Sequence, residues 1–165
     1  MKIGIFYGST TGHTEQAAQQ ICQLLPGSTA KPVNDAVKAE FESCNLLILG
    51  TSTWGLGDLQ DDWIDALDCL RSANLQGKQF ALFGLGDQLG YPDTFIDGIK
   101  VLYDVASEAG AEPVGSWSDV GYRYEASAAA TGEGFLGLAL DEDNQPELSE
   151  ERIQAWVEQL LREIK

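Results

Sequence analysis

Two almost uninterrupted apolar runs, NLLILGT at residues 45–51 and QFALFGL at residues 79–85, constrain the fold of this chain most strongly. A strand that packs on only one face alternates apolar and polar residues, whereas an unbroken apolar run suits a strand covered on both faces. Strands of that kind occur in parallel sheets, where helices cover both sides. We therefore expect an α/β fold with two buried central strands.

Strand and helix patterns alternate along the whole chain. Strands are expected at residues 2–7, 29–33, 45–51, 79–85 and 113–117, with helices at residues 14–25, 35–44, 59–70, 94–109 and 149–164. Ser149 suits the N-cap of the last helix. Residues 118–140 form an insert, in which residues 135–140 are read as an extra strand. This order predicts a parallel sheet between two helical layers, in one domain over residues 1–165.

The net charge limits the possible partners. Ten Lys and Arg stand against 26 Asp and Glu, a formal charge of −16, which disfavours nucleic acid and anionic membranes and favours a cationic partner. One acidic run consists of Asp58, Asp61, Asp62, Asp65 and Asp68. A second consists of Asp141, Glu142, Asp143, Glu147, Glu150 and Glu151. The first is either a docking surface or a solvated face; the second is interpreted as solvated surface.

The three cysteines indicate neither a disulfide framework nor a zinc site, because their number is odd and no CxxC spacing occurs. Cys22 and Cys44 have apolar neighbours and are expected to be buried thiols. The apolar stretch before Gly8 is too short for a signal-peptide core, and no segment approaches the length of a membrane span. We expect a cytoplasmic protein.

The loop GSTTGHT, residues 8–14, has the composition of a phosphate cradle. Glycines let the backbone turn its N–H groups inward, the hydroxyls add donors, and the following helix N-terminus favours an anion. The spacing matches neither a Walker A loop nor a dinucleotide GxGxxG turn, and the loop contains no Lys or Arg. This pattern predicts a site for one terminal phosphate; an ordinary turn with a helix cap is the alternative.

Two further loops each place an aromatic residue after a buried strand. Trp54 lies in TSTWGLGD at residues 51–58, and Tyr91 lies in GLGDQLGYPD at residues 84–93. Each ring either covers the core or stacks on a flat ligand. Since ligands of such sheets bind beyond the carboxyl ends of the strands, the phosphate loop and both rings are expected at one rim.

Together the three loops resemble the flavin-binding loops of the flavodoxin family, specifically its long-chain members. The segment GFLGLALDEDNQPELSEERIQAWVEQL at residues 134–160 resembles the end of the long-chain insert and the final helix. The likeness covers the whole chain and is nearest to cyanobacterial or bacterial electron carriers. It implies a doubly wound five-stranded parallel sheet of order 2-1-3-4-5, with helices on both faces and an insert at the fifth strand.

The resemblance also implies a role for individual residues in binding FMN. The phosphate contacts would be Ser9, Thr10, Thr11, Gly12, His13 and Thr14, where His13 replaces the more usual Lys or Asn. Trp54 would stack on the inner face of the flavin and Tyr91 on its outer face, with Gly55 beside N5. The remaining cofactor contacts would be Ser52, Thr53, Leu56, Gly57, Gly86, Asp87 and Asp143, the last toward the ribityl chain.

The implied function is that of a monomeric, low-potential one-electron carrier that shuttles between semiquinone and hydroquinone. The implied partners are basic redox proteins such as ferredoxin–NADP reductase, with photosystem I and nitrogenase reductase as further candidates. An NAD(P)H:quinone oxidoreductase of the same fold is the alternative, which Tyr91 over the outer face disfavours. A phosphoacceptor signalling domain would need an acidic cluster after the first strand, and this strand ends in Phe6, Tyr7 and Gly8.

Overall fold

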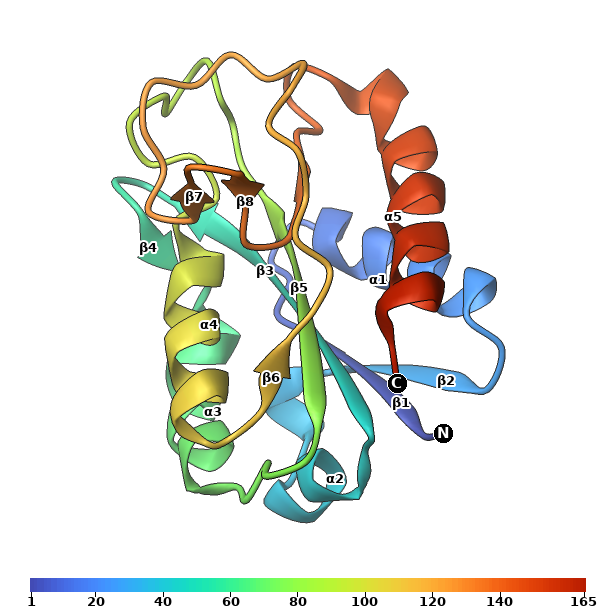
Figure 1. Ribbon diagram of the computed structural model, residues 1–165. Helices are drawn as coiled ribbons and strands as arrows, with labels where there is room; N and C mark the ends of the chain where they lie inside the picture. The colour runs from blue at the N-terminus through green and yellow to red at the C-terminus, as the bar shows by residue number, and fades with distance from the viewer.

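A central parallel sheet organises the computed structural model, which describes residues 1–165 (Figure 1). Its strands follow the order β2-β1-β3-β5-β6, and every neighbouring pair on this path is parallel. The strands are β1 (Ile3–Tyr7), β2 (Ser28–Pro32), β3 (Leu46–Trp54), β5 (Gln79–Leu85) and β6 (Glu112–Pro113). The two-residue β4 (Asp58–Leu59) lies off this path, so the main strands have the expected order 2-1-3-4-5.

The two apolar runs form the central strands β3 and β5, which pair from Leu46 opposite Gln79 to Ser52 opposite Leu85. All of β5 is buried, and β3 is buried as far as Thr51. β3 continues to Trp54, beyond the predicted end, because its last two residues pair antiparallel with β4. The resulting hairpin carries Trp54 past the carboxyl edge of the main sheet.

Helices cover both faces of the sheet (Figure 1). One layer contains α1 (His13–Leu24) and α5 (Ser149–Glu163); the other contains α2 (Lys38–Ser43), α3 (Asp61–Ser72) and α4 (Gly98–Glu108). Alternate residues of β3 enter the two cores: Leu46 and Ile48 pack with α1 and α5, and Leu47 and Leu49 pack on the other side. This two-sided burial explains the unbroken apolar pattern. None of the helices is both long and apolar enough to cross a membrane.

Several helix boundaries differ from the sequence-based prediction. The helix expected over residues 35–44 is a 3₁₀ turn, Val33–Asp35, followed by the shorter α2. Residues 94–97 form turns, so α4 begins only at Gly98. Ser149 is not an N-cap, because the 3₁₀ turn Pro146–Leu148 precedes it and its hydroxyl donates to Glu142. Cys44 is buried as expected, whereas Cys22 is half-buried.

The fifth strand is the largest departure from expectation. Residues 113–117 do not form a continuous strand, since β6 ends at Pro113 and Gly115 has a φ of 80°, which turns the chain away. The edge of β5 is completed by β9 (Leu138–Leu140), which pairs parallel with it from Phe83 onward. Between these two pieces lies the insert, with a short hairpin of β7 (Ala130–Thr131) and β8 (Gly134–Phe135).

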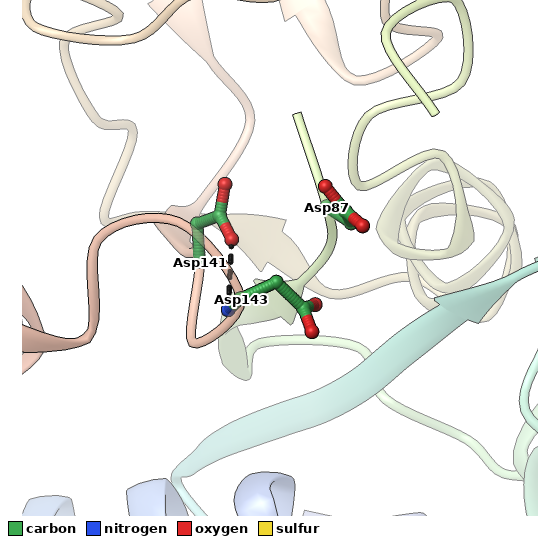
Figure 2. Close-up of side chains that lie close together, drawn as sticks. All are labelled: Asp87, Asp141 and Asp143. Carbon is green, nitrogen blue, oxygen red and sulfur yellow. Dashed lines mark hydrogen bonds between the residues drawn. The ribbon is translucent and has the colours of Figure 1, made fainter. Parts of the chain in front are cut away.

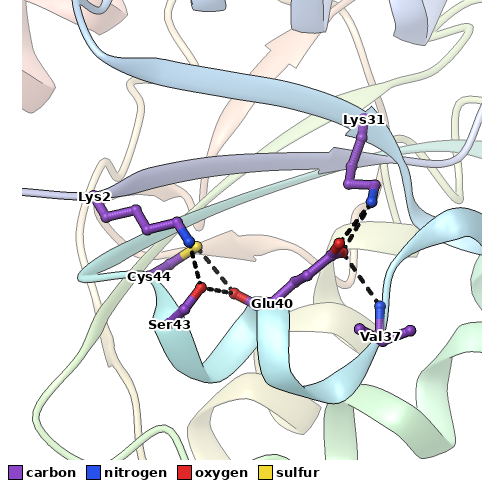
Figure 3. Close-up of polar contacts among 6 residues, drawn as sticks. All are labelled: Lys2, Lys31, Val37, Glu40, Ser43 and Cys44. Atoms are coloured by element: carbon purple, nitrogen blue, oxygen red, sulfur yellow. Dashed lines mark hydrogen bonds and ion pairs between the residues drawn. The ribbon is translucent and has the colours of Figure 1, made fainter.

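A polar network holds the short helix α2 against β2 (Figure 3). Lys31 Nζ donates to both carboxylate oxygens of Glu40 at 2.8 and 3.0 Å, and the Val37 N–H donates to Glu40 Oε2 at 3.3 Å. The hydrogen bond from Lys31 is the main cause that lowers the pKa of Glu40. The Val37 bond completes a helix start that the sequence marks only weakly.

Candidate functional site

The carboxyl ends of the central strands open into a cavity of about 220 Å³. Its wall combines residues from the loop after β1 and the start of α1, from the ends of β3 and β5 and the loops that follow them, and from the segment after β9. They are Thr11, His13, Thr14, Ser52, Thr53, Trp54, Gly55, Leu85, Gly86, Asp87, Tyr91, Glu142 and Asp143. The topology therefore brings together three loops that are far apart in the chain, at the edge where doubly wound sheets bind their ligands.

The first loop presents unpaired donors in front of α1. Gly12, with φ 93°, directly precedes the helix, and its N–H donates to Ser9 Oγ at 3.1 Å. The N–H groups of Thr10, Thr11 and His13 donate to no protein atom. The first N–H groups of any helix lack intrahelical acceptors and carry its positive dipole end, so this loop can hold an anion without Lys or Arg.

Gln60 ties this loop to α3, and the sequence pattern does not single it out. Its side chain is 2% exposed, and its Nε2 donates to Thr10 Oγ1 at 3.1 Å. Its Oε1 accepts the N–H of Asp62 at 2.9 Å and so caps α3. A Cβ on Gly8 would lie 2.1 Å from this oxygen, so glycine is required there.

The two aromatic side chains lie on the cavity wall and remain partly exposed, Trp54 by 40% and Tyr91 by 47%. Trp54 Nε1 donates to Ser52 Oγ at 2.8 Å, which fixes the edge of the indole ring. Gly55 next to it has φ 53°, in the left-handed region that favours glycine. Both rings thus offer apolar faces that the protein core does not cover.

The other residues singled out from the sequence lie near the wall or outside it. Ser9, Thr10 and Gly12 line an adjoining hollow on the other side of the first loop, together with Thr11. Leu56 is 86% exposed, and both it and Gly57 lie outside the wall. Conversely, Leu85 and Glu142 belong to the wall and were not predicted. The position of Leu85 at the end of β5 is the signal that could have revealed it.

An acidic cluster borders the cavity (Figure 2). The carboxylates of Asp87, Asp141 and Asp143 lie within 4.8 Å of one another, and the Asp143 N–H donates to Asp141 Oδ1 at 3.1 Å. Burial is the main cause that raises the pKa of Asp143, and the charges of Asp87 and Asp141 add to it, while nearby His13 opposes it. Asp141 is fully buried. The interpretation of the second acidic run as solvated surface is therefore wrong at this residue.

The electrostatic surroundings of the cavity are negative. His13 is the only residue of the wall that can become a cation, whereas Asp87, Glu142 and Asp143 are acids. In the first acidic run, Asp68 forms an ion pair with Arg71 at 2.7 Å. The other members form no ion pair; they are Asp58, Asp61, Asp62 and Asp65. Additional negative charge on a bound ligand is therefore disfavoured.

The wall suits a flat aromatic ligand with one phosphate. It combines the neutral N–H donors of Thr11 and His13 with the aromatic rings of Trp54 and Tyr91 and with three carboxylates. Carboxylates accept hydrogen bonds from hydroxyl or N–H groups of a ligand. No Lys or Arg is available for a second phosphate group.

Comparisons with known proteins place the chain as a whole. The family model described as "Flavodoxin" matches residues 5–156. The chain is 44% identical to the flavodoxin of Synechococcus elongatus over 99% of this chain and 98% of that protein. It is also 44% identical to flavodoxin 2 of Escherichia coli K12, over 99% and 97% of the two chains.

Among solved structures, the chain is similar to the Fusobacterium nucleatum flavodoxin bound to flavin mononucleotide. The TM-score is 0.94 at 36% identity, with 99% of both chains covered. A mutant of the same flavodoxin, also bound to flavin mononucleotide, gives a TM-score of 0.93 at 37% identity over 99% of this chain and 97% of that one. The match spans the sheet, both helical layers and the insert, and the chain therefore belongs to the flavodoxin family.

Proposed function

We propose that this protein carries single electrons between redox proteins by means of non-covalently bound FMN. The observation that carries the proposal is the cavity, where unpaired N–H donors of the first loop lie on the same wall as Trp54 and Tyr91. The flavodoxin structures with bound flavin mononucleotide support the choice of ligand. FMN supplies the one-electron chemistry when it is bound, and the protein tunes it.

The loop of residues 9–14 would hold the phosphate. Its backbone N–H groups and hydroxyls are neutral donors, and the dipole of α1 adds a favourable field at the same place. The acids on the same wall, Asp87, Glu142 and Asp143, oppose an anion, so the phosphate would depend on direct contact with these N–H groups, where the field of the helix end is strongest. The residues assigned to the phosphate are Ser9, Thr10, Thr11, Gly12, His13 and Thr14.

The flavin ring would lie between Trp54 and Tyr91, which exclude water from its faces. Gly55 would present its peptide group to the edge of the ring, and its positive φ supports this role, because glycine can reorient that group at little cost. The other assigned contacts border the ring and the ribityl chain; they are Ser52, Thr53, Leu56, Gly57, Gly86, Asp87 and Asp143. Leu56 and Gly57 would contact the ring edge from outside the wall.

The acidic surroundings support a low reduction potential. A carboxylate ~10 Å from the ring raises the energy of an added negative charge by roughly 0.4 kcal/mol in a water-like dielectric, or about 15–20 mV. The stacked aromatic faces act in the same direction, since they carry negative potential. Several such acids together lower the potential by tens of millivolts, and salt reduces the effect.

Flavodoxins exchange electrons with other redox proteins, and here the net charge of −16 favours basic ones. Candidates of this kind are ferredoxin–NADP reductase, photosystem I and nitrogenase reductase. We expect the carrier to act as a monomer in the cytoplasm. The three free cysteines, none of them paired, are compatible with a reducing compartment.

An absorbance scan of the purified protein tests the assignment first. A flavin spectrum that disappears on removal of the cofactor and returns with added FMN is the expected result. Stopped-flow mixing with NADPH alone then separates the carrier from an NAD(P)H:quinone oxidoreductase, because rapid reduction without a partner protein would contradict a pure carrier. If the rate of electron transfer with a basic redox protein did not change with ionic strength, the docking role of the acids would be contradicted.

A further inference from the structure

The turn that carries Tyr91 is built around the side chain of Asp87. Asp87 Oδ1 accepts the N–H groups of Gly90 at 2.7 Å and Leu89 at 3.2 Å, and the Tyr91 N–H donates to the Asp87 carbonyl at 2.9 Å. A Cβ on Gly90 would lie 2.3 Å from the carboxylate, so this group fills the turn. The place of the Tyr91 ring on the cavity wall therefore depends on where Asp87 is held.

Asp141 supplies the fixed point to which this turn is attached. It follows β9, far from the turn in sequence, and it is 0% exposed. Its carboxylate takes part in no ion pair and accepts only neutral donors: the N–H groups of Gln88, Asp143 and Asn144 and the side-chain amides of Gln88 and Asn144. A buried carboxylate surrounded by this many donors resists displacement, because losing one leaves a charge poorly solvated.

Asn144 connects the two carboxylates. Its Nδ2 donates to Asp87 Oδ1 at 2.7 Å and to Asp141 Oδ2 at 2.8 Å. An amide nitrogen carries two hydrogens, so both are used by this bridge. Burial alone raises the pKa of Asp87, but the donors Gly90, Asn144 and Leu89 outweigh it and lower the pKa overall. Without the amide, two carboxylates would face each other with no donor between them and would repel.

We infer that Asn144 is a positioning residue that holds Tyr91 in place over the flavin cavity by bridging Asp87 to the buried Asp141. The inference rests on the proposed function, since the ring of Tyr91 needs its place only if a flavin stacks on it. Asn144 itself does not line the cavity, and it acts through the turn. Gln88 anchors the start of the same turn to Asp141, and the Pro92 carbonyl just after Tyr91 accepts the N–H groups of Glu125 and Ala126. Asn144 acts between these two anchors, through the Asp87 carboxylate that accepts the N–H groups of Leu89 and Gly90.

The expected effect of Asn144→Ala is a loss of affinity for the ring and not for the phosphate. Apo-protein would be titrated with FMN and with riboflavin, following the quenching of flavin fluorescence. Because the phosphate loop is untouched, both ligands are expected to bind about tenfold more weakly, which corresponds to about 1.4 kcal/mol. Asn74→Ala is the matched control, since Asn74 is an exposed asparagine just after the C-terminal end of α3 and outside the cavity wall, and it should leave both affinities unchanged.

A double-mutant cycle with Tyr91→Ala separates positioning from a general structural role. If Asn144 acts through the Tyr91 ring, Asn144→Ala costs about tenfold in the wild-type background and close to nothing when Tyr91 is already alanine. An undiminished loss in the Tyr91→Ala background would overturn the inference. Circular dichroism and thermal unfolding of each variant confirm that the compared proteins are folded.

Asp87→Asn provides a chemical rescue. An amide at position 87 still accepts from Gly90, and the repulsion between the two carboxylates is removed. Because Asp87 is itself an assigned flavin contact, Asp87→Asn alone is the reference for the Asn144→Ala/Asp87→Asn double variant, and Asn144→Ala should cost less flavin affinity in the Asp87→Asn background than in the wild type. If Asn144 merely filled space, its loss would cost the same in both backgrounds, and the inference would be wrong.

Should Asn144→Ala not fold, Asn144→Ser takes its place in the cycle. Its single hydroxyl can donate to only one of the two carboxylates, and an intermediate loss that again depends on Tyr91 is expected. A loss that does not depend on Tyr91 overturns the inference here as well. If the wild-type apo-protein binds neither FMN nor riboflavin, the proposed function and the inference are both overturned. If the wild type binds normally but the loss caused by the Asn144 variant does not depend on Tyr91, only the inference is overturned.

Discussion

Gln60→Leu tests the connection between the phosphate loop and α3. Leucine is close to glutamine in size, so the change removes the polar contacts with little change in packing volume. It abolishes the bonds from Gln60 Nε2 to Thr10 Oγ1 and to the Asp62 carboxylate, together with the cap on the Asp62 N–H. Thr10 is exposed and Asp62 half-buried, so water replaces part of what these groups lose, and net values for each contact apply.

The magnitude follows from the cap and the bond to Thr10, because the charged Asp62 carboxylate can regain a donor from water. A lost N-cap costs about 1 kcal/mol, and a lost neutral hydrogen bond about 1 kcal/mol, so unfolding should become easier by about 2 kcal/mol. For a chain of this length each kcal/mol lowers the melting temperature by about 2–4 °C, so the apo-protein should melt roughly 4–8 °C lower. The hydrophobic side chain in the same space recovers little, because its neighbours remain polar.

The ligand assay distinguishes this variant from a general loss of stability. Since Thr10 lies in the phosphate loop, the ratio of FMN to riboflavin affinity should fall, while riboflavin affinity itself changes little. Gln154→Leu is the control, because Gln154 is an exposed glutamine on α5. An unchanged melting temperature, or equal losses for both ligands, would refute the reasoning.

Four further predictions follow from the same geometry. Four acids of the first run form no ion pair: Asp58, Asp61, Asp62 and Asp65. Replacing all four with asparagine should raise the reduction potential for the second electron by about 70 mV in total at low salt. An unchanged potential in a redox titration would contradict this. Gly50→Ala places a Cβ 2.0 Å from the ring of Phe83 and should destabilise the protein by about 1–3 kcal/mol, so an unaltered urea midpoint would be inconsistent. Gly55→Val places a β-branched residue where φ is 53°, a region that such residues rarely adopt. The difference between the reduction potentials for the first and the second electron should therefore become smaller, which a redox titration of the variant measures. The pKa of Asp87 lies below its ordinary 3.8, so the ionised carboxylate stabilises the fold above about pH 4, and this stabilisation is lost as pH falls through the folded pKa. The difference in free energy of unfolding between wild type and Asp87→Asn, measured in urea, should therefore shrink from pH 7 to pH 3.

The central sheet could be predicted because its signals are long and local. β3 and β5 are unbroken apolar runs, and α5 carries a regular stripe that includes Ile153, Trp156 and Leu160. These patterns depend only on which neighbouring residues are apolar. The rule that ligands bind at the carboxyl ends of parallel strands then located the loops of the cavity wall.

The fifth strand could not be predicted in this way. Residues 113–117 have the composition of a strand, but the positive φ at Gly115 diverts the chain, and residues from beyond the insert complete the edge of β5. That pairing joins segments far apart in sequence. A local pattern carries no information about such a partner.

The burial of Asp141 is a similar case. Within a run of acids the residue looks solvated, and only the donors of Gln88 and Asn144 make its burial tolerable. Gln60 also escapes a pattern search, because its importance comes from contacts with Thr10 in the first loop and with Asp62 at the start of α3. In both residues the tertiary structure, and not the residue type, decides the role.

The divided fifth strand has a consequence for how such a chain can change in length. Pro113 lies opposite Phe80 and Leu138 opposite Phe83, so three steps along β5 span the whole insert. A chain that ran directly from one piece to the other could keep the same register along β5. The edge of this sheet is thus a natural splice point, where evolution or protein engineering can graft, exchange or remove a segment and leave the register of the flavin-binding strands intact. Excision would remove the aromatic cover of Phe95 by Tyr122, Tyr124 and Phe135, and with it the hydrogen bonds that the N–H groups of Glu125 and Ala126 donate to the Pro92 carbonyl.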